Sequence, residues 1–359
     1  MISQCPSQTD AFRDLSRIFA NRHDRVLEFE ILPPAFGPIL EDGDAVGITK
    51  KYLVQAFVIA RRVFFDGLQS WKQDDGGLSS EGSEGGRFSN DLDSKLVFAS
   101  EIILLFDCEH LTACNWRKKR LSALLELNQE RYIPALHTEL SLLTTYLTSR
   151  LHRHTKSPTL WQHRKWIRTH LVRAHSPDVH ELQELIHVEL SVVLRAGDSH
   201  PRNYYAFSYM RQMHHILSER GRGGGKGWGI PLARSIIAPT LDWCLAHPAD
   251  ISGLMFLLYL LNVVPDTALR VDTVSKVARF AVNVGWEGES IWTFIELSLR
   301  GLDLLRSLEE SQVYPWDILR SSLEPNEPQY SGSKPATAWK TWLDRARAHW
   351  VQSTNTPHA

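Results

Sequence analysis

The chain has 359 residues, 43% of them hydrophobic, so it is long enough to bury a sizeable core, and length alone suggests about two domains. Its 40 basic and 41 acidic residues give a formal net charge of -1. This balance argues against a nucleic-acid binder held by global charge, although residues 117–120 (RKKR) form a local basic run. Four scattered cysteines without a CxxC pair argue against a disulfide framework, and the apolar helical context of Cys108 and Cys114 favours buried free thiols.

The N-terminus has no apolar segment of the kind that a signal peptide needs. The longest apolar stretch, residues 254–264, is too short to span a bilayer and is better interpreted as a buried helix. We therefore expect a soluble, cytoplasmic protein in a reducing compartment, without a membrane span.

Nearly every long segment has apolar residues at helical spacing. Leu140, Leu143 and Leu147 are one example. No convincing run of alternating polar and apolar residues is bounded by hairpin turns, so strands should be few or absent. The pattern predicts an all-α fold.

Three segments interrupt the helical pattern. Residues 73–91 are polar, acidic and glycine-rich, which predicts a mobile loop. The glycine-rich segment 221–229 predicts a second flexible loop. Residues 321–335 contain three prolines and predict a tether before a last helix at about 337–351.

The strongest pattern is an internal repeat. In five segments a helix ends, a short turn follows, and a new helix opens with an apolar or aromatic anchor. The anchors are Cys114, Trp161, Phe207, Leu254 and Trp292, at intervals of 47, 46, 47 and 38 residues. This period fits one helix pair plus its connections. A lone pair cannot bury both faces, so we expect neighbouring pairs to stack into a curved solenoid.

The turns support these helix starts. Pro158, Pro201 and Pro248 lie at or just before the predicted first residues, where a missing N–H costs little. Asn203 and Asp250 hold equivalent places in their repeats, and both are favourable N-cap residues.

At this point a family resemblance becomes visible. The segments KSPTLWQHRKW (156–166) and PRNYYAFSYMRQ (201–212) resemble the protein prenyltransferase α-subunit repeat, roughly P-x-N-Y-x-x-W-x-x-R. The first of these is closer still to the prenyltransferase α-subunit repeat-containing proteins, a divergent branch. The resemblance covers about 94–300, and its last two repeats rest on spacing. It implies a right-handed α–α superhelix: one repeat domain over 1–330, followed by a linker and C-terminal helix over 331–359.

In that family the α-subunit wraps around a β-subunit, which holds the catalytic zinc and most of the isoprenoid pocket. The α-subunit lends polar side chains to the diphosphate end. The resemblance assigns catalytic roles to Lys156, Tyr204 and Tyr205, and substrate-binding roles to Asn203 and Arg164. An ammonium beside a departing diphosphate stabilises the developing charge, and Tyr or Asn can donate hydrogen bonds to the same oxygens.

The chain also departs from the family pattern. Apolar residues replace the expected Trp at Cys114, Phe207 and Leu254, and the expected Arg at Met210, Leu257 and Ile295. Pro158 stands where many members have Tyr, and Tyr205 where some have His. The replacements are mostly apolar and suit a helical core.

Each predicted site residue also has a structural interpretation. Lys156 before a turn is by default a solvated surface lysine, and Asn203 is first an N-cap. Arg164 suits hydrogen bonds to neighbouring turns, and Tyr204 and Tyr205 suit packing as well as a site. The aromatic anchors are by default core residues.

Metal and nucleotide sites find little support. The histidines between 152 and 175 form no HExxH motif, and no Cys/His set has zinc-finger spacing, so we expect no metal or cofactor in this chain and zinc only in its partner. The glycine run is not a P-loop, because Gly227 follows Lys226 where Ser or Thr is required.

The leading hypothesis is therefore the α-like, non-zinc subunit of a heterodimeric protein prenyltransferase. The resemblance implies geranylgeranyl transfer to C-terminal cysteines of target proteins, with a β-subunit, a prenyl diphosphate and a protein substrate as partners. The alternative is a non-catalytic α-solenoid scaffold for protein–protein interaction, which the degenerate anchors favour. A nucleic-acid-binding helical repeat is disfavoured by the even charge and the absence of a base-reading code.

Overall fold

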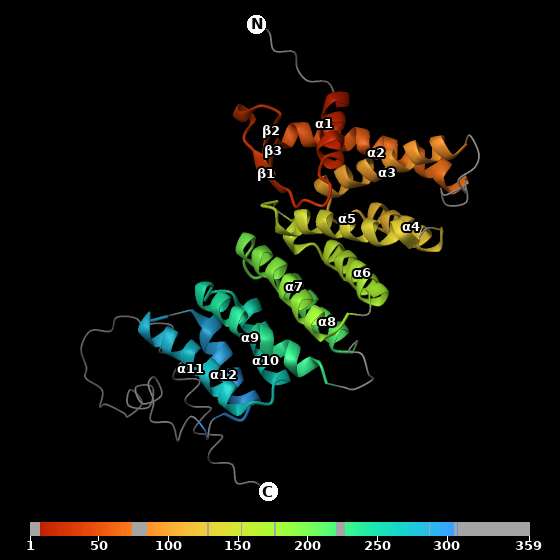
Figure 1. Ribbon diagram of the computed structural model, residues 1–359. Helices are drawn as coiled ribbons and strands as arrows, with labels where there is room; N and C mark the ends of the chain where they lie inside the picture. Colours follow the sequence, from red (N-terminus) through yellow and green to blue (C-terminus); the bar gives the residue numbers. More distant parts are fainter. Residues whose placement is uncertain are drawn as a thin grey trace. The chain divides into compact units, whose positions relative to one another are not determined.

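The computed structural model describes residues 8–73, 85–127, 129–151, 153–175, 177–219, 227–286, 288–304 and 307. The chain divides into two compact units (Figure 1). Unit 1 comprises residues 1–177 and 191–210, and unit 2 comprises 178–190 and 211–359. The expected single repeat domain over 1–330 stays a prediction, and the expected segment 331–359 lies outside the described residues.

The fold is an all-α helical repeat, as the sequence predicts. The described residues form twelve α-helices: α1 (Gln8–Ala20), α2 (Lys50–Gln73), α3 (Gly85–Phe106), α4 (Leu111–Leu127), α5 (Gln129–Thr148), α6 (Pro158–His175), α7 (Val179–Ser199), α8 (Tyr204–Ser218), α9 (Gly229–Ala246), α10 (Ile251–Val263), α11 (Thr267–Asn283) and α12 (Glu289–Gly301). Two short 3-10 turns, η1 (Pro34–Phe36) and η2 (His154–Lys156), complete the helical elements of this part of the chain.

The repeat appears as a strict alternation of helices. The five anchors lie in α4, α6, α8, α10 and α12, and α5, α7, α9 and α11 come between them along the chain. All five anchor side chains are buried, so the predicted core role is confirmed for each. In unit 1, α6 packs on α4 and α5, and in unit 2, α10 packs on α9 and α12. Helix pairs therefore bury their apolar faces against neighbours.

A small sheet near the N-terminus is the main addition to the predicted fold. It contains β1 (Glu28–Leu32), β2 (Ile39–Asp42) and β3 (Ala45–Thr49) in the order β1-β3-β2. β1 pairs with β3 in parallel, Glu28 opposite Ala45, and β2 pairs with β3 in antiparallel register, Ile39 opposite Ile48. Phe29, Val46 and Ile48 share the buried face. The edge of β1 is held by α5, because Thr145 and Ser149 hydroxyls accept the Leu27 and Phe29 N–H groups.

The turn predictions are confirmed at the helix starts. Pro158 is the first residue of α6, and Pro201 and Pro248 each lie three residues before a helix. The Asp250 carboxylate accepts hydrogen bonds from the Ser252 and Gly253 N–H groups, as an N-cap does.

The predicted loop 73–91 is longer than the connection between α2 and α3 in the structure. α2 includes Gln73, and α3 begins at Gly85, so residues 85–91 are helical. Packing overrides the polar composition here, because Leu92 and Leu96 lie against Gly67 of α2 and draw α3 alongside that helix. Residues 74–84 lie outside the described part of the chain.

The other predicted irregular segments fall mostly outside the described residues. In the glycine-rich loop, α9 already begins at Gly229, and residues 220–226 are not described. The tether 321–335 and the helix 337–351 also lie outside.

Cys108, Cys114 and Cys244 are free and buried, which confirms the thiol prediction for Cys108 and Cys114. Burial raises the pKa of the Cys108 thiol to about 11 and that of Cys114 to about 12. Over the described ranges, no helix combines the length and apolar character needed to cross a membrane.

Candidate functional site

The turn before α6 carries Lys156 and is tied firmly to unit 1. Ser157 caps α6 by accepting the Leu160 N–H at 3.1 Å, and its hydroxyl donates to the Cys108 carbonyl at 3.1 Å. His154 Nε2 donates to the Leu104 carbonyl at 2.9 Å. These bonds connect η2 to the end of α3 and the turn that follows it, so the backbone around Lys156 has a defined position.

The same turn is joined to the start of α8. Asn203 Nδ2 donates to the Thr155 carbonyl at 2.6 Å, and Trp161 Nε1 donates to that carbonyl at 2.8 Å. The Thr155 hydroxyl is hydrogen-bonded to His200 Nδ1 at 2.9 Å. Asn203 Oδ1 also accepts the Ala206 N–H at 3.2 Å, which confirms the predicted N-cap of α8.

Lys156 itself is exposed. Its Nζ donates to the Pro201 carbonyl at 2.9 Å, and it forms no ion pair with a carboxylate among the described residues. An ammonium group has three donors, so this bond leaves two for a ligand. Lys156 therefore lies beside the connection that leads into α8.

Tyr204 and Tyr205 form the first turn of α8 and are 65% and 44% exposed. Their rings pack edge to face with centroids 5.9 Å apart. The N-terminus of a helix carries partial positive charge from its unpaired N–H groups. Lys156 is bonded to the connection that leads into α8, and Tyr204 and Tyr205 are exposed at the start of that helix. We call these three residues the α8 entry group.

The two residues predicted to bind substrate are placed differently. Asn203 is fully buried, with its amide bonded on both sides as described above. Arg164 is 1% exposed, and its guanidinium donates to the Thr144 hydroxyl at 2.8 Å. Their substrate-binding roles stay predictions, and both polar groups are out of reach of solvent in this structure.

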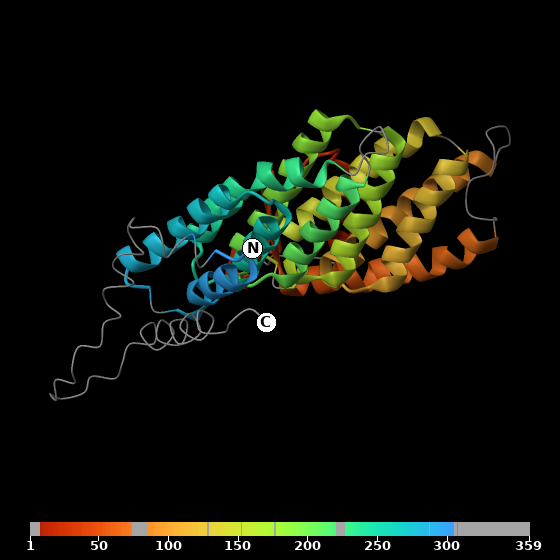
Figure 2. The ribbon, with the colours of Figure 1, turned by 90° about the horizontal axis from the view of Figure 1, so that it is seen from below.

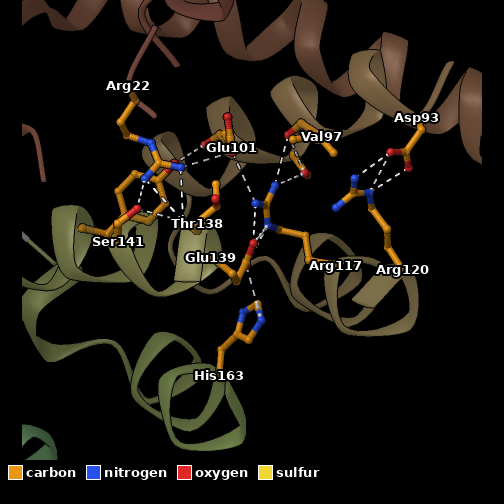
Figure 3. Close-up of polar contacts among 12 residues, drawn as sticks. Arg22, Asp93, Val97, Glu101, Arg117, Arg120, Thr138, Glu139, Ser141 and His163 are labelled. Atoms are coloured by element: carbon orange, nitrogen blue, oxygen red, sulfur yellow. Dashed lines mark hydrogen bonds and ion pairs between the residues drawn. The ribbon is translucent and has the colours of Figure 1, made fainter. Parts of the chain in front are cut away.

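A second polar cluster lies inside unit 1 and was not anticipated from the sequence (Figure 3). Arg117, at the arginine position of the first repeat, donates from Nε to both Glu139 carboxylate oxygens at 2.8 and 3.0 Å. Arg117 Nη2 also donates to Glu101 Oε1 at 3.3 Å, and Nη1 donates to the Ser100 hydroxyl and the Val97 carbonyl. The cluster joins α3, α4 and α5.

Arg22 and His163 complete this cluster. Arg22 lies 3.9 Å from Glu101 and donates to the Thr138 carbonyl. His163 Nε2 lies 3.4 Å from Glu139 Oε1, close enough for an ion pair if the imidazole is protonated. Neither ring nitrogen of His163 forms a hydrogen bond with the described residues. Figure 3 shows that His163 approaches Glu139 from the next helix, α6.

The electrostatics of the cluster follow from its burial. Burial alone would raise the pKa of Glu139, but the Arg117 guanidinium outweighs burial and lowers it to about 2. Burial raises the pKa of Glu101 even though Arg117 and Arg22 are near. Burial lowers the pKa of His163 to about 4, against the pull of Glu139. Shifted pKa values often mark functional sites, yet every member here is buried, so we interpret the cluster as a structural connection between four helices.

Sequence reasoning missed this cluster because its partners are distant along the chain. Arg117 meets Glu101 and Glu139 across 16 and 22 residues. The available signal was the placement of Glu101 directly before the apolar run 102–105, where an unpaired charge would be costly.

No set of three or more His, Cys, Asp or Glu side chains converges as a metal ion would require, as far as the described residues go. The expectation that zinc belongs to a partner stays a prediction.

Comparison with known proteins gives a distant relationship. No protein-family profile matches the chain. It is 26% identical to Protein prenyltransferase alpha subunit repeat-containing protein 1 of Danio rerio, over 46% of this chain and 38% of that protein. It is 26% identical to Protein prenyltransferase alpha subunit repeat-containing protein 1-B of Xenopus laevis, over 63% of this chain and 51% of that protein.

The chain thus spans about half or less of the length of these curated relatives. The repeat spacing, the five buried anchors and these two similarities agree with one another. The chain is a distant homologue of the prenyltransferase α-subunit repeat-containing proteins.

Proposed function

We propose that the chain is the α-like, non-zinc subunit of a heterodimeric protein prenyltransferase that transfers a geranylgeranyl group to C-terminal cysteines of target proteins. The observation that supports this most is the α8 entry group, in which Lys156 is exposed and bonded to the connection before α8 while Tyr204 and Tyr205 are exposed at the start of that helix. The names of the two distant relatives support the family but not the reaction or the partner.

The chemistry fits these three side chains. In prenyl transfer the acceptor sulfur forms a bond to the first carbon of the isoprenoid, and the bond from that carbon to the diphosphate oxygen breaks. The diphosphate departs with additional negative charge. Lys156 can stabilise that charge through its ammonium, and Tyr204 and Tyr205 can donate hydrogen bonds to the same oxygens. The proposed partner supplies the zinc that activates the acceptor sulfur.

The rigid surroundings of Lys156 add support. Groups aimed in advance at developing charge are more effective than groups that must reorganise. Three hydrogen bonds hold the turn that carries Lys156 in place: Ser157 donates to the Cys108 carbonyl, His154 donates to the Leu104 carbonyl, and the Thr155 carbonyl accepts from Asn203. Two of the three Lys156 ammonium donors are available to a ligand while the third stays on the Pro201 carbonyl.

Co-expression tests the partnership. The full chain, carrying a tag, is produced with each candidate prenyltransferase β-subunit and purified through the tag. We expect one β-subunit to co-purify in a one-to-one complex that transfers labelled geranylgeranyl from its diphosphate to a protein ending in a cysteine motif. Failure to form a stable complex with any of them would sink the proposal.

The alternative is a non-catalytic helical-repeat scaffold. It draws support from the burial of Asn203 and Arg164 and from the use of the Lys156 ammonium by a backbone carbonyl. A scaffold predicts binding to a partner without dependence on the chemistry of Lys156. The two functions are therefore separated by the transfer rate of a complex that lacks this ammonium.

A further inference from the structure

The outer side of α2 in unit 1 has an unusual composition. Successive turns of the helix place Val54, Val58 and Phe65 on one side, at spacings of four and seven residues. Tyr52, Ala56 and Ala60 point the opposite way and are buried. Figures 1 and 2 show α2 at the border of unit 1. The outer side of this helix therefore combines these apolar residues with the exposed Arg61, which follows Val54 by seven residues and precedes Phe65 by four.

Two further exposed apolar side chains lie on either side of the turn between α3 and α4: Phe106 is the last residue of α3, and Leu111 is the first residue of α4. Phe106 stacks on Phe57 of α2 with ring centroids 4.2 Å apart, and Phe65 lies 6.2 Å from His110, the residue before Leu111. The exposed fractions are 37% for Val54, 42% for Val58, 38% for Phe106 and 62% for Leu111. We call these four residues, together with Phe65, the α2 stripe.

Basic residues flank the α2 stripe. Lys50, Lys51, Arg61 and Arg62 are all exposed. Within the described residues none of them forms an ion pair, and Arg61 stacks over the Phe65 ring at 5.1 Å. Between residues 50 and 69, Asp66 is the single acidic residue. The side chains around the stripe thus offer four positive charges and one negative charge.

The carboxylates of the neighbouring elements are bound elsewhere. On α1, Asp14 accepts from Tyr52 on the inner side of α2. On α3, Asp91 pairs with Lys95, and Asp93 pairs with Arg120. In the turn, Glu109 accepts from the Thr159 hydroxyl, and Asp107 accepts the Glu109 N–H. The positive charge beside the stripe is therefore not neutralised by these groups.

We propose that the α2 stripe docks on an anionic membrane surface. Apolar side chains on one helix face can enter the boundary between headgroups and acyl chains, while long basic side chains reach the lipid phosphates. A partner helix would need a groove to receive it. The α2 stripe instead follows the outer side of α2, with Phe106 at the end of α3 and Leu111 at the start of α4, and charge complementarity favours an anionic lipid surface as its partner. The geometry places the helix along the membrane plane.

Vesicle flotation tests this proposal independently of any prenyl transfer. The full chain is mixed with vesicles of phosphatidylcholine alone or with 30 mol% phosphatidylserine (composition chosen as a roughly physiological anionic surface). We expect clear flotation with the anionic vesicles and little with neutral ones. Each basic residue near such a surface strengthens binding by about fivefold. The double variant Arg61→Glu/Arg62→Glu should therefore bind at least twentyfold more weakly.

A matched control separates local from global charge. Arg234→Glu/Lys276→Glu changes net charge equally but lies in unit 2, at residues that are about half exposed and paired with Asp266 and Asp272. This control should retain most binding. Val58→Ser/Leu111→Ser, which keeps every charge, should weaken binding at least threefold through lost apolar contact. Circular dichroism confirms that each variant is folded.

Three results would overturn the proposal. The wild-type chain could fail to float with anionic vesicles, which would leave an acidic protein surface as the candidate occupant. The Arg234→Glu/Lys276→Glu control could lose as much binding as Arg61→Glu/Arg62→Glu. The vesicles would then respond to the net charge of the protein and not to the basic residues beside the α2 stripe. The serine variant could bind like wild type, which would leave the apolar stripe without a role.

Discussion

The Asn203 amide donates a 2.6 Å hydrogen bond to the Thr155 carbonyl, joining the first turn of α8 to the residue next to Lys156. Both residues are fully buried. The bond links positions in two successive repeats, 48 residues apart. It holds the backbone next to the exposed Lys156 against the start of α8, where Tyr204 and Tyr205 are exposed.

Replacing Asn203 by Ala should destabilise unit 1 by about 2 kcal/mol, because the change removes both an N-cap and a buried hydrogen bond. Urea unfolding followed by circular dichroism measures the difference. Asn262→Ala is the control: its amide donates to the Leu258 carbonyl from an exposed position, so the cost should stay within about 0.5 kcal/mol. Equal losses in the two variants would contradict the importance of the Asn203 link.

The two ends of the basic run 117–120 should respond very differently to mutation. Arg117→Met leaves Glu139 and Glu101 buried without their main cationic partner, so we expect a loss of about 3–5 kcal/mol in the free energy of unfolding. Arg120 pairs with Asp93 near the surface, with about a quarter of each side chain exposed. Arg120→Met should therefore cost at most about 1 kcal/mol.

Chemical denaturation of both variants under the same conditions measures this contrast. Similar losses for Arg117 and Arg120 would show that the buried cluster in Figure 3 is not a principal connection between these helices.

The free energy of unfolding should fall as the pH drops from 6.5 to 4. Burial lowers the pKa of both His154 and His163 to about 4, so in the folded state they resist protonation in this range, while the unfolded chain takes up protons near pH 6.5. The unfolded state then binds more protons than the folded state, so acid favours unfolding. The free energy of unfolding should fall by up to about 1.4 kcal/mol per pH unit for each histidine.

His163→Leu tests this sign and magnitude. Denaturation at several pH values should give a slope reduced by up to about 1.4 kcal/mol per pH unit relative to wild type. His180→Leu, at an exposed position, serves as the control for replacing a histidine by leucine. A His163→Leu slope equal to that of wild type would contradict the burial of an uncharged imidazole beside Glu139.

The helical repeat could be predicted because its signal is local. Trp161 and Phe207 each follow a turn that carries its own proline and cap, and an aromatic residue at such a spacing has to be buried. The same reasoning found Asn203 as an N-cap. It could not find the second bond of that amide, because the Thr155 carbonyl belongs to the preceding repeat.

The small sheet was harder to predict. β2 has no buried residue, and β1 has only Phe29 buried, so alternation of polar and apolar residues is weak in both strands. β1 is held to its neighbours through the Leu27 and Phe29 N–H groups, a contact across more than a hundred residues of sequence. β2 and β3 form an antiparallel hairpin whose two-residue turn is Gly43 and Asp44, with Gly43 at a φ of 59°, so the Asp42-Gly43 pair was a hairpin signal that sequence reasoning missed.

The catalytic roles of Lys156, Tyr204 and Tyr205 stay predictions: all three side chains are exposed, and the Lys156 ammonium is bonded to the Pro201 carbonyl, three residues before Tyr204. Arg164 and Asn203 lie in the core instead, because the arginine reaches back to Thr144 and the asparagine to Thr155. Sequence spacing places a residue on a helix turn but does not say whether a neighbouring repeat covers it.

The most direct test of the central claim is the rate of a single turnover of geranylgeranyl transfer by the complex with its β-subunit, with Lys156→Ala compared to wild type. We expect at least a tenfold fall, about 1.4 kcal/mol of lost transition-state stabilisation, while the complex stays intact by gel filtration. Lys156→Arg, which keeps the charge, should retain more of the rate than Ala does. An intact Lys156→Ala complex that transfers at the wild-type rate would contradict a catalytic role for the α8 entry group and would favour the scaffold.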